Sequence, residues 1–184
     1  FLLNRSSDLS FLTTINNLDK CNVQTILADA FNGDIALTSL EVPASVTVIK
    51  DNAFQASGIK YLTINVGNLT TFGDGTNSLY GAAGNDVLEE LTLKGVLNTA
   101  IASNAFAASE NLATLDLSQM TFKSTVGAVV GMGQFAANSF KDCTSLTAVA
   151  FPTLQGSANP VIAANAFAGC TSLATVSITA IKGK

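Results

Sequence analysis

Glu90 and Asp116 are the two residues of this 184-residue sequence whose types and spacing best suit acid–base chemistry. Two carboxyl groups held at a fixed separation form the catalytic pair of most glycoside hydrolases. The chain contains no histidine, so it lacks the commonest general base and the commonest metal ligand. No aromatic platform or cleft is indicated beside the two carboxylates. We therefore expect a solvated surface there and no enzyme, and a glycoside hydrolase is the least favoured of three hypotheses.

Metal chemistry has one candidate segment. The stretch GAAGNDVL (81–88) resembles a single calcium-binding nonapeptide, G-G-x-G-x-D-x-L, with Ala82 in place of a glycine. Such sites need stacked copies because each ion is shared between adjacent turns, and the sequence holds one copy. We therefore expect no metal ion and no cofactor.

The composition argues against two classes of partner. Charged residues make up 12% of the chain, against roughly 25% in typical soluble proteins. The net charge is −4, and lysine and arginine form no cluster. Nucleic-acid binding draws on a basic patch, so it is not expected. No apolar run approaches the ~18 residues that span a bilayer, so we expect no membrane span, and a lipid anchor would lie outside these residues.

A recurring phrase indicates which elements must position the candidate residues. The stretch ASNAFAASENLATLDL (102–117) returns as IAANAFAGCTSLATVSI (162–178), and looser copies precede both. Copies that recur every 20 to 50 residues or so are typical of a solenoid, because one coil cannot bury its apolar face alone. Six coils are predicted. The residues expected to stack through their core are Phe31, Phe54, Leu79, Phe106, Phe140 and Phe167.

Each core position is preceded by two characteristic residues. An Asx residue lies two positions earlier, and a small residue lies one position earlier. The Asx side chain is suited to cap a short helical turn by accepting a free N–H, and the small residue lets neighbouring turns approach closely. The predicted turn caps are Asp29, Asn52, Asn77, Asn104, Asn138 and Asn165.

A strand is predicted at the end of each coil. The apolar residues there follow the pattern L-x-x-L-x-L, in which alternate side chains face the core and the others face outward. Six such strands predict a parallel sheet, and its outward face is the surface on which we expect a ligand to bind. The outward residues assigned to ligand binding are Ser39, Glu41, Tyr61, Thr63, Glu90, Thr92, Thr114 and Asp116. Glu90 and Asp116 are expected to be diagonal neighbours on that face.

The repeat resembles the BspA-like leucine-rich repeats of bacterial surface proteins, whose pattern is approximately I-x-x-N-A-F-x-x-C-x-x-L-x-x-L-x-I-P. The stretch 162–178 fits this pattern before the proline, with Val176 in place of the second leucine, and the resemblance covers about residues 23–178. Leu79 departs from the family phenylalanine, and the family cysteine occurs at Cys143 and Cys170 alone. The resemblance implies a secreted or outer-surface protein for adhesion or recognition, without catalytic residues.

The three cysteines are too few for a disulfide framework. Cys143 and Cys170 share one column of adjacent coils, where the Cα separation suits a disulfide but parallel Cβ vectors do not. Two free, buried thiols are therefore favoured over a disulfide. Cys21 has no evident partner.

We expect one domain, with residues 1–22 as an N-terminal capping segment and residues 23–184 as a right-handed solenoid. A parallel sheet is expected on one face and short helical turns opposite. The insertions at 73–86 and 118–134 are expected to be loops, for which simple length variation is favoured over a binding role. No C-terminal cap is visible, so the last coil is either short and polar enough to end the stack or a contact surface for another domain or chain. We expect a monomer or weak end-to-end association.

Two functional hypotheses from different classes remain. The leading one is a non-catalytic binding or adhesion module at the cell surface or secreted, which recognises a protein or glycan through the sheet face and the inserted loops. The alternative is a structural spacer or assembly segment of a longer surface protein.

Overall fold

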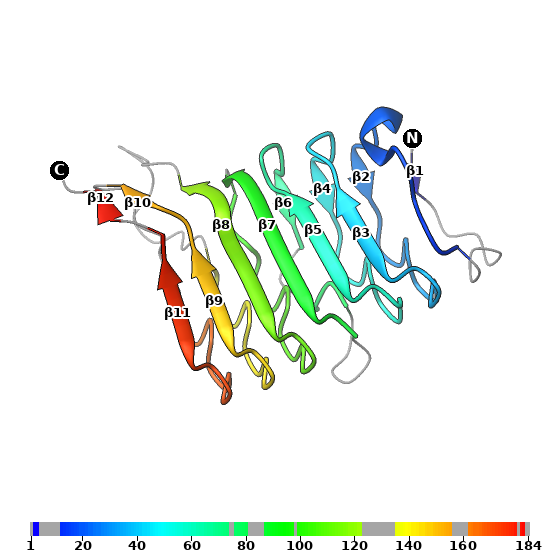
Figure 1. Cartoon of the computed structure of the whole chain (residues 1–184). Coiled ribbons are helices and arrows are strands. Elements are labelled where there is room, and N and C mark those ends of the chain that lie inside the picture. The colour runs from blue at the N-terminus through cyan, green and yellow to red at the C-terminus, as the bar shows by residue number, and fades with distance from the viewer. Residues whose placement is uncertain are drawn as a thin grey trace.

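The computed structural model describes residues 2–3, 12–73, 76–80, 87–97, 99–122, 135–155, 162–179 and 181–182. Successive coils lie side by side, with the N-terminus at one end of the stack and the C-terminus at the other (Figure 1). Every strand pair is parallel, as expected when each coil repeats the path of the one before. The predicted leucine-rich repeat solenoid is therefore confirmed.

One strand from each of six coils forms the main sheet. Its members, in order from the N-terminal to the C-terminal edge, are β3 (Ser39–Val42), β5 (Tyr61–Asn65), β7 (Glu90–Leu97), β8 (Thr114–Phe122), β9 (Ala148–Phe151) and β11 (Thr175–Ile178). Burial alternates along β3, where Leu40 and Val42 are buried while Ser39 and Glu41 are exposed. The alternation arises because successive strand residues point to opposite faces of a sheet.

The predicted columns pair in register across this sheet. Leu40 lies opposite Leu62, which lies opposite Leu91. The register shifts once, between β7 and β8, where Thr92 pairs with Asp116 but Lys94 pairs with Gln119. The extra β8 residue is a β-bulge, which bends a strand and increases its twist.

A second, narrower parallel ladder lies on another side of the coils and was not predicted. Its strands, in order, are β1 (Leu2–Leu3), β2 (Thr25–Ile26), β4 (Val48–Ile49) and β6 (Thr71–Phe72). Single bridges from Ile101 to Phe135 and from Phe135 to Ile162 follow the same column through the later coils. A separate pair joins β10 (Leu154–Gln155) to β12 (Ile181–Lys182). The ladder follows an apolar column five residues before the core position, except in the third coil, where Phe72 takes this place.

Turns, and not the expected helical segments, carry the core residues. Within the described residues the single helix is the 3-10 helix η1 (Leu18–Cys21), close to the N-terminus. In every coil but the third, the turn is closed by a backbone bond such as that from the N–H of Gln55 to the carbonyl oxygen of Asn52, at 3.0 Å. The predicted Asx residues begin these turns in a left-handed conformation, with φ of 59–61° at Asp29, Asn52, Asn104, Asn138 and Asn165.

The left-handed backbone explains why these positions hold Asn or Asp. Asparagine and aspartate tolerate this region better than other non-glycine residues, whereas an α-helix needs negative φ. A second left-handed residue lies two positions after the core phenylalanine, as at Ala56 and Ala108. In the first, second, fourth, fifth and sixth coils, two such reversals turn the chain too sharply for a helix to form. The capping role of the Asx side chains stays a prediction.

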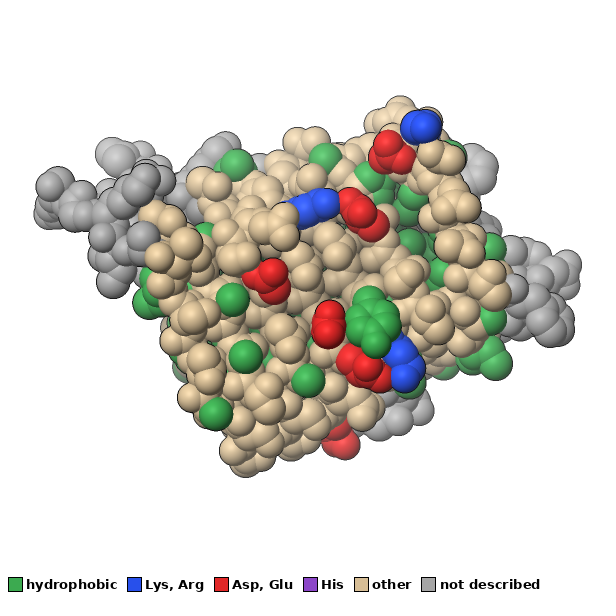
Figure 2. Space-filling model, viewed as in Figure 1, with side chains coloured by type: hydrophobic (Ala, Val, Ile, Leu, Met, Phe, Trp, Pro, Cys, Tyr) green, Lys and Arg blue, Asp and Glu red, His purple; other side chains and the backbone are tan. Residues whose placement is uncertain are grey.

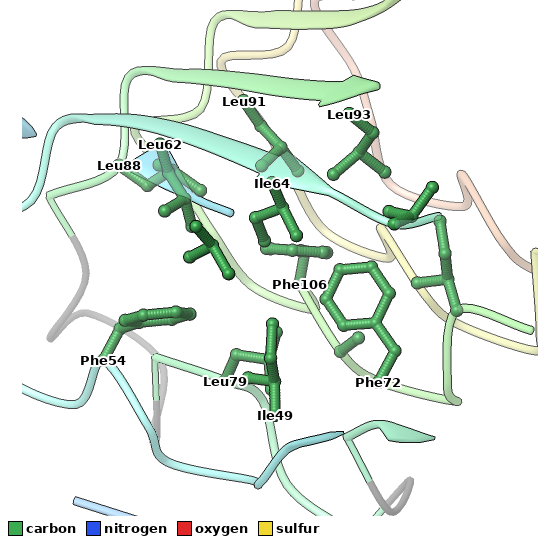
Figure 3. Packing of buried hydrophobic residues seen from close by; sticks show 14 of the residues in the cluster. Ile49, Phe54, Leu62, Ile64, Phe72, Leu79, Leu88, Leu91, Leu93 and Phe106 are labelled. Carbon is green, nitrogen blue, oxygen red and sulfur yellow. The ribbon is translucent and has the colours of Figure 1, made fainter. Parts of the chain in front are cut away.

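The aromatic column forms a stacked file in the interior. Ring centroids lie 5.7 Å apart between Phe31 and Phe54, and 5.3 Å apart both between Phe106 and Phe140 and between Phe140 and Phe167. Figure 3 shows Phe54, Leu79 and Phe106 within the hydrophobic cluster, on the opposite side from the sheet residues Leu62 and Leu91. The rings therefore fill the space between the turns and the main sheet.

Tyr80 is a core residue that sequence reasoning missed. Its ring lies 5.6 Å from that of Phe54, its side chain is 1% exposed, and its hydroxyl donates to the Ile59 carbonyl oxygen at 3.3 Å. The N–H of Phe54 donates to the carbonyl oxygen of Leu79, whereas that of Phe31 donates to Ala53, the residue before a core phenylalanine. In the contact between the second and third coils, Tyr80 therefore takes the place of the core phenylalanine, although Leu79 is buried as well. The sequence signal that could have revealed this core residue is the aromatic side chain directly after the aliphatic Leu79.

Cysteine burial follows the position of each coil in the stack. Cys143 is buried and Cys170 is half-buried; both are free thiols, and each Sγ donates to a carbonyl oxygen of the preceding coil at 3.2 Å. Partial burial raises the pKa of the Cys170 thiol. Cys170 was expected to be fully buried, and it is not because it lies in the last described coil.

Candidate functional site

The outward face of the main sheet brings together all eight residues assigned to ligand binding. Ser39, Tyr61, Glu90 and Thr114 form one row of paired residues across β3, β5, β7 and β8. The parallel row is Glu41, Thr63, Thr92 and Asp116. We call these eight residues the polar face. Their placement was predicted from the repeat, but no observation here tests whether they bind a ligand.

Charge is unevenly distributed over the sheet. Figure 2 shows acidic and basic side chains gathered over β3, β5, β7 and β8, and none over β9 and β11. The last two strands have the sequences AVAF and TVSI, which contain no ionisable residue. The face is therefore divided into a charged region and a neutral region.

Two ion pairs connect the strands of the charged region. The Lys60 Nζ lies 2.7 Å from Glu89 Oε1, and the Tyr61 hydroxyl lies 3.4 Å from Glu89 Oε2. The Lys94 Nζ on β7 lies 2.6 Å from Glu41 Oε1 on β3, so this pair reaches across β5. Sequence reasoning missed Lys60, Glu89 and Lys94, because the repeat pattern fixes apolar columns and says nothing about which exposed charges meet.

Glu90 and Asp116 lie two register positions apart on neighbouring strands, as expected for diagonal neighbours. Asp116 Oδ1 accepts a hydrogen bond from the Ser118 N–H at 2.8 Å, so one oxygen of this carboxylate already has a partner within its own strand. Tyr61 is paired with Glu90 in the sheet and is 45% exposed. The arrangement offers two carboxylates and one aromatic ring on an open surface, which suits recognition better than catalysis.

A hollow of about 370 Å³ lies at the N-terminal edge of the polar face, between the segment around η1 and the first coil. Its lining residues are Ile15, Asn16, Asn17, Leu18, Asp19, Glu41 and Pro43. Glu41 belongs both to this hollow and to the ion pair with Lys94. The hollow was not predicted, since it depends on how the N-terminal segment lies against the first coil. It does not contain Glu90 or Asp116.

The Lys60–Glu89 pair makes a pH-dependent contribution that can be measured. The hydrogen bond from the Lys60 ammonium lowers the pKa of Glu89 below its ordinary value and raises the pKa of Lys60. Because the pKa of Glu89 is lower in the folded state, the stabilisation is present above the ordinary glutamate pKa of about 4.3 and is lost in more acidic solution.

Lys60→Met is therefore expected to raise the pKa of Glu89 toward its ordinary value, as measured by an NMR titration of the side-chain carboxyl. The stability difference between this variant and the parent should shrink as the pH falls below 4. Lys20→Met, at an exposed lysine near the N-terminus, serves as the control and should leave the pKa of Glu89 unchanged. An unchanged pKa in the Lys60 variant would show that the ion pair is not populated in solution.

The recurrence of the coil decides the family. The BspA type leucine rich repeat region matches the chain in 6 copies, over residues 9–126 and 131–182. The chain belongs to the BspA-type leucine-rich repeat family. Comparisons with curated proteins and with solved structures gave no match. The BspA-type repeat is a solenoid of the kind that is typically non-catalytic, and the family suggests a protein-interaction or surface module.

The BspA-type match includes part of the segment predicted as an N-terminal cap. It begins at residue 9, whereas the cap was assigned to residues 1–22. In this segment, Leu18 of η1 is buried, and η1 contacts β3. The boundary at residue 22 stays a prediction.

Two further expectations concern metals and membranes. In the described part of the chain, no three His, Cys, Asp or Glu side chains come together as a metal site. Residues 81–86 of the segment that resembles a calcium-binding nonapeptide lie outside the described residues. Residues 74–75 and 123–134 of the two insertions lie outside them as well. Among the described residues, no helix has the length and apolar character needed to cross a bilayer.

Proposed function

We propose that this BspA-type chain is a non-catalytic recognition module, secreted or displayed on a cell surface, that binds a protein or glycan through its polar face. The observation that carries the proposal is the polar face itself. Eight polar or aromatic side chains are held in register on a sheet whose outward side is not covered by any other described element (Figure 1). Repeat solenoids use such extended surfaces for binding.

A protein ligand fits this face better than a glycan. Glu90 and Asp116 take part in neither of the two ion pairs of the face, so they are available to a cationic partner. Tyr61 stands beside Glu90 and offers a half-exposed ring, which packs against aliphatic side chains and against the guanidinium of arginine. A ligand surface with lysine or arginine at its centre would meet complementary charge.

The experiment is a binding screen against matrix proteins and glycans, followed by titration of each hit with variants of the polar face. The double variant Tyr61→Ala/Glu90→Ala is expected to weaken binding by about 30-fold or more, as a central aromatic anchor does. Glu110→Ala removes an exposed carboxylate on a turn and should leave the affinity unchanged. A screen without hits in several buffers, or equal affinities for the double variant and the parent, would refute the proposal.

A further inference from the structure

The charged region of the main sheet carries more acidic than basic side chains (Figure 2). On β3, β5, β7, β8 and the residue directly before each strand, the four acids and two bases are Glu41, Glu89, Glu90, Asp116, Lys60 and Lys94. Glu41 and Glu89 are each paired with a lysine, at 2.6 and 2.7 Å. Glu90 and Asp116 are paired with neither lysine, so two negative charges are left on this face.

Tyr61 stands beside Glu90, and its ring is held at both ends. The two residues pair in register on β5 and β7, so their Cα atoms lie about 4.8 Å apart. The Tyr61 hydroxyl donates to Glu89 Oε2 at 3.4 Å, and Glu89 Oε1 accepts a hydrogen bond from the Lys60 ammonium at 2.7 Å. These contacts limit the rotation of the exposed ring and keep it next to the Glu90 carboxylate.

An aromatic ring beside a carboxylate suits a guanidinium group. The flat guanidinium of arginine stacks on an aromatic ring and can donate two parallel hydrogen bonds to one carboxylate. The ammonium of lysine has no flat face and is more strongly hydrated, so it gains less from the same surroundings. Tyr61 and Glu90 together therefore favour arginine over lysine.

Asp116 places the second negative charge at a fixed distance from the first. Glu90 pairs with Thr114 on β8, and Asp116 lies two residues further along that strand. With strands about 4.8 Å apart and a rise of about 3.3 Å per residue, the Cα atoms of Glu90 and Asp116 lie about 8 Å apart. In an extended peptide, residues i and i+2 point to the same side at about 6.6 Å. Two long basic side chains with this spacing reach both carboxylates.

Short side chains leave both carboxylates accessible. Glu90 pairs with Thr114, and Asp116 pairs with Thr92, so the two threonines complete a four-residue patch with the two acids. Thr114 is exposed and Thr92 is half-buried. A ligand chain that lies over the two threonines meets no bulky side chain between the two negative charges.

We propose that the polar face binds an extended basic segment of a protein ligand, with an arginine on Tyr61 and Glu90 and a second basic residue, two positions away in the ligand, on Asp116. The proposal rests on the proposed function, because it states which chemistry the polar face recognises. A neutral glycan offers no cation to these carboxylates. The ligand pattern is Arg-x-Arg or Arg-x-Lys in an extended conformation.

Peptide titrations followed by NMR test the proposal without a natural ligand. The chain has two tyrosines and no tryptophan, and Tyr80 is 1% exposed, so the ring signals of Tyr61 report on this face. A blocked peptide with the pattern Arg-Thr-Arg should shift these signals and bind about threefold more tightly than Lys-Thr-Lys. A peptide with two adjacent arginines has the same charge, but its side chains point to opposite sides, so it should bind about threefold more weakly.

Two outcomes of these titrations would overturn the proposal. In the first, the Arg-Thr-Arg peptide binds no more tightly than either of the other two peptides. In the second, the peptide leaves the ring signals of Tyr61 unchanged.

Matched variants locate the contacts of the Arg-Thr-Arg peptide. Glu90→Gln and Asp116→Asn each remove one negative charge and should each weaken binding by about threefold. Glu110→Gln removes the same charge from a turn outside the sheet and should leave the affinity unchanged. Tyr61→Leu keeps an apolar side chain but should abolish the preference for arginine over lysine. Equal losses for Glu90→Gln and Glu110→Gln would mean that general charge attraction explains the binding, and would refute the site.

Competition separates this proposal from the proposed function. A protein ligand found by screening matrix proteins and glycans should be displaced by the Arg-Thr-Arg peptide, and its affinity should fall as the salt concentration rises. A ligand that is weakened by Tyr61→Ala/Glu90→Ala but is not displaced by the peptide would overturn the basic segment and leave the proposed function standing. A screen without hits, together with peptide binding as described, would support the basic-segment site and refute the proposed function.

Discussion

Phe106→Ala is expected to lower the free energy of unfolding by about 3–5 kcal/mol, as truncation of a fully buried phenylalanine generally does. The Phe106 side chain has 0% exposure, stacks on Phe140 with centroids 5.3 Å apart, and meets Phe72 edge to face at 5.8 Å. Truncation would leave a cavity between the rings of Phe72 and Phe140, which the two neighbouring coils contribute. The measurement is urea unfolding followed by circular dichroism, with the slope and the midpoint fitted separately.

Thr114→Ala is the matched control for this variant. Thr114 is exposed on β8, eight residues from Phe106 in the same coil, and its loss should cost less than about 0.5 kcal/mol. Similar losses in both variants would mean that the assignment of core and outward faces is wrong.

Gly58→Ala should destabilise the chain by about 3 kcal/mol, at the upper end of the range for overpacking. A Cβ at this position would collide with the backbone carbonyl of Ile35 in the preceding coil. The N–H of Gly58 also donates to the Asp34 carbonyl oxygen at 3.1 Å, which fixes the approach of the two backbones. The second coil is one residue shorter than the first at this point, so its chain passes directly over Ile35. Thermal and chemical unfolding of the variant provide the measurement.

Gly33→Ala separates steric collision from backbone strain. Gly33 has φ of +82°, and a Cβ there would meet nothing within 4 Å. Its replacement should therefore cost about 1 kcal/mol, from the left-handed conformation alone. If both alanine variants lost the same stability, the close approach at Gly58 would not be a feature of the protein in solution.

The polar face shows which features of a candidate binding surface a repeat pattern predicts and which it does not. The pairing of Tyr61 with Glu90 and of Thr92 with Asp116 followed from counting positions after each core residue. The ion pair between Glu41 and Lys94 did not, because it joins residues two strands apart across β5. An exposed charged side chain has several possible partners, and the geometry of the neighbouring coils decides which of them it contacts. A pattern within one coil does not contain that geometry.

The sequence by itself determined the winding of this protein. Every coil repeats the same apolar positions, and one coil cannot bury them alone, so successive coils stack with these positions in register. The order and register of the main sheet therefore followed from the spacing of leucines and phenylalanines. The third coil was the exception, because Leu79 and Tyr80 both reach the core and only contact with Phe54 selects the ring of Tyr80.

Only the tertiary structure decided the backbone conformation of the turns, the second ladder and the state of the two ends. The Asx residues suit a helix cap and a left-handed turn alike, and the approach of the next coil decides between them. The same apolar column is covered at Ile26 and open at Ile162, although the local sequences are similar. The physical reason is common to these cases: burial and backbone pairing in a solenoid depend on the neighbouring coil, and the sequence of one coil does not state what lies beside it.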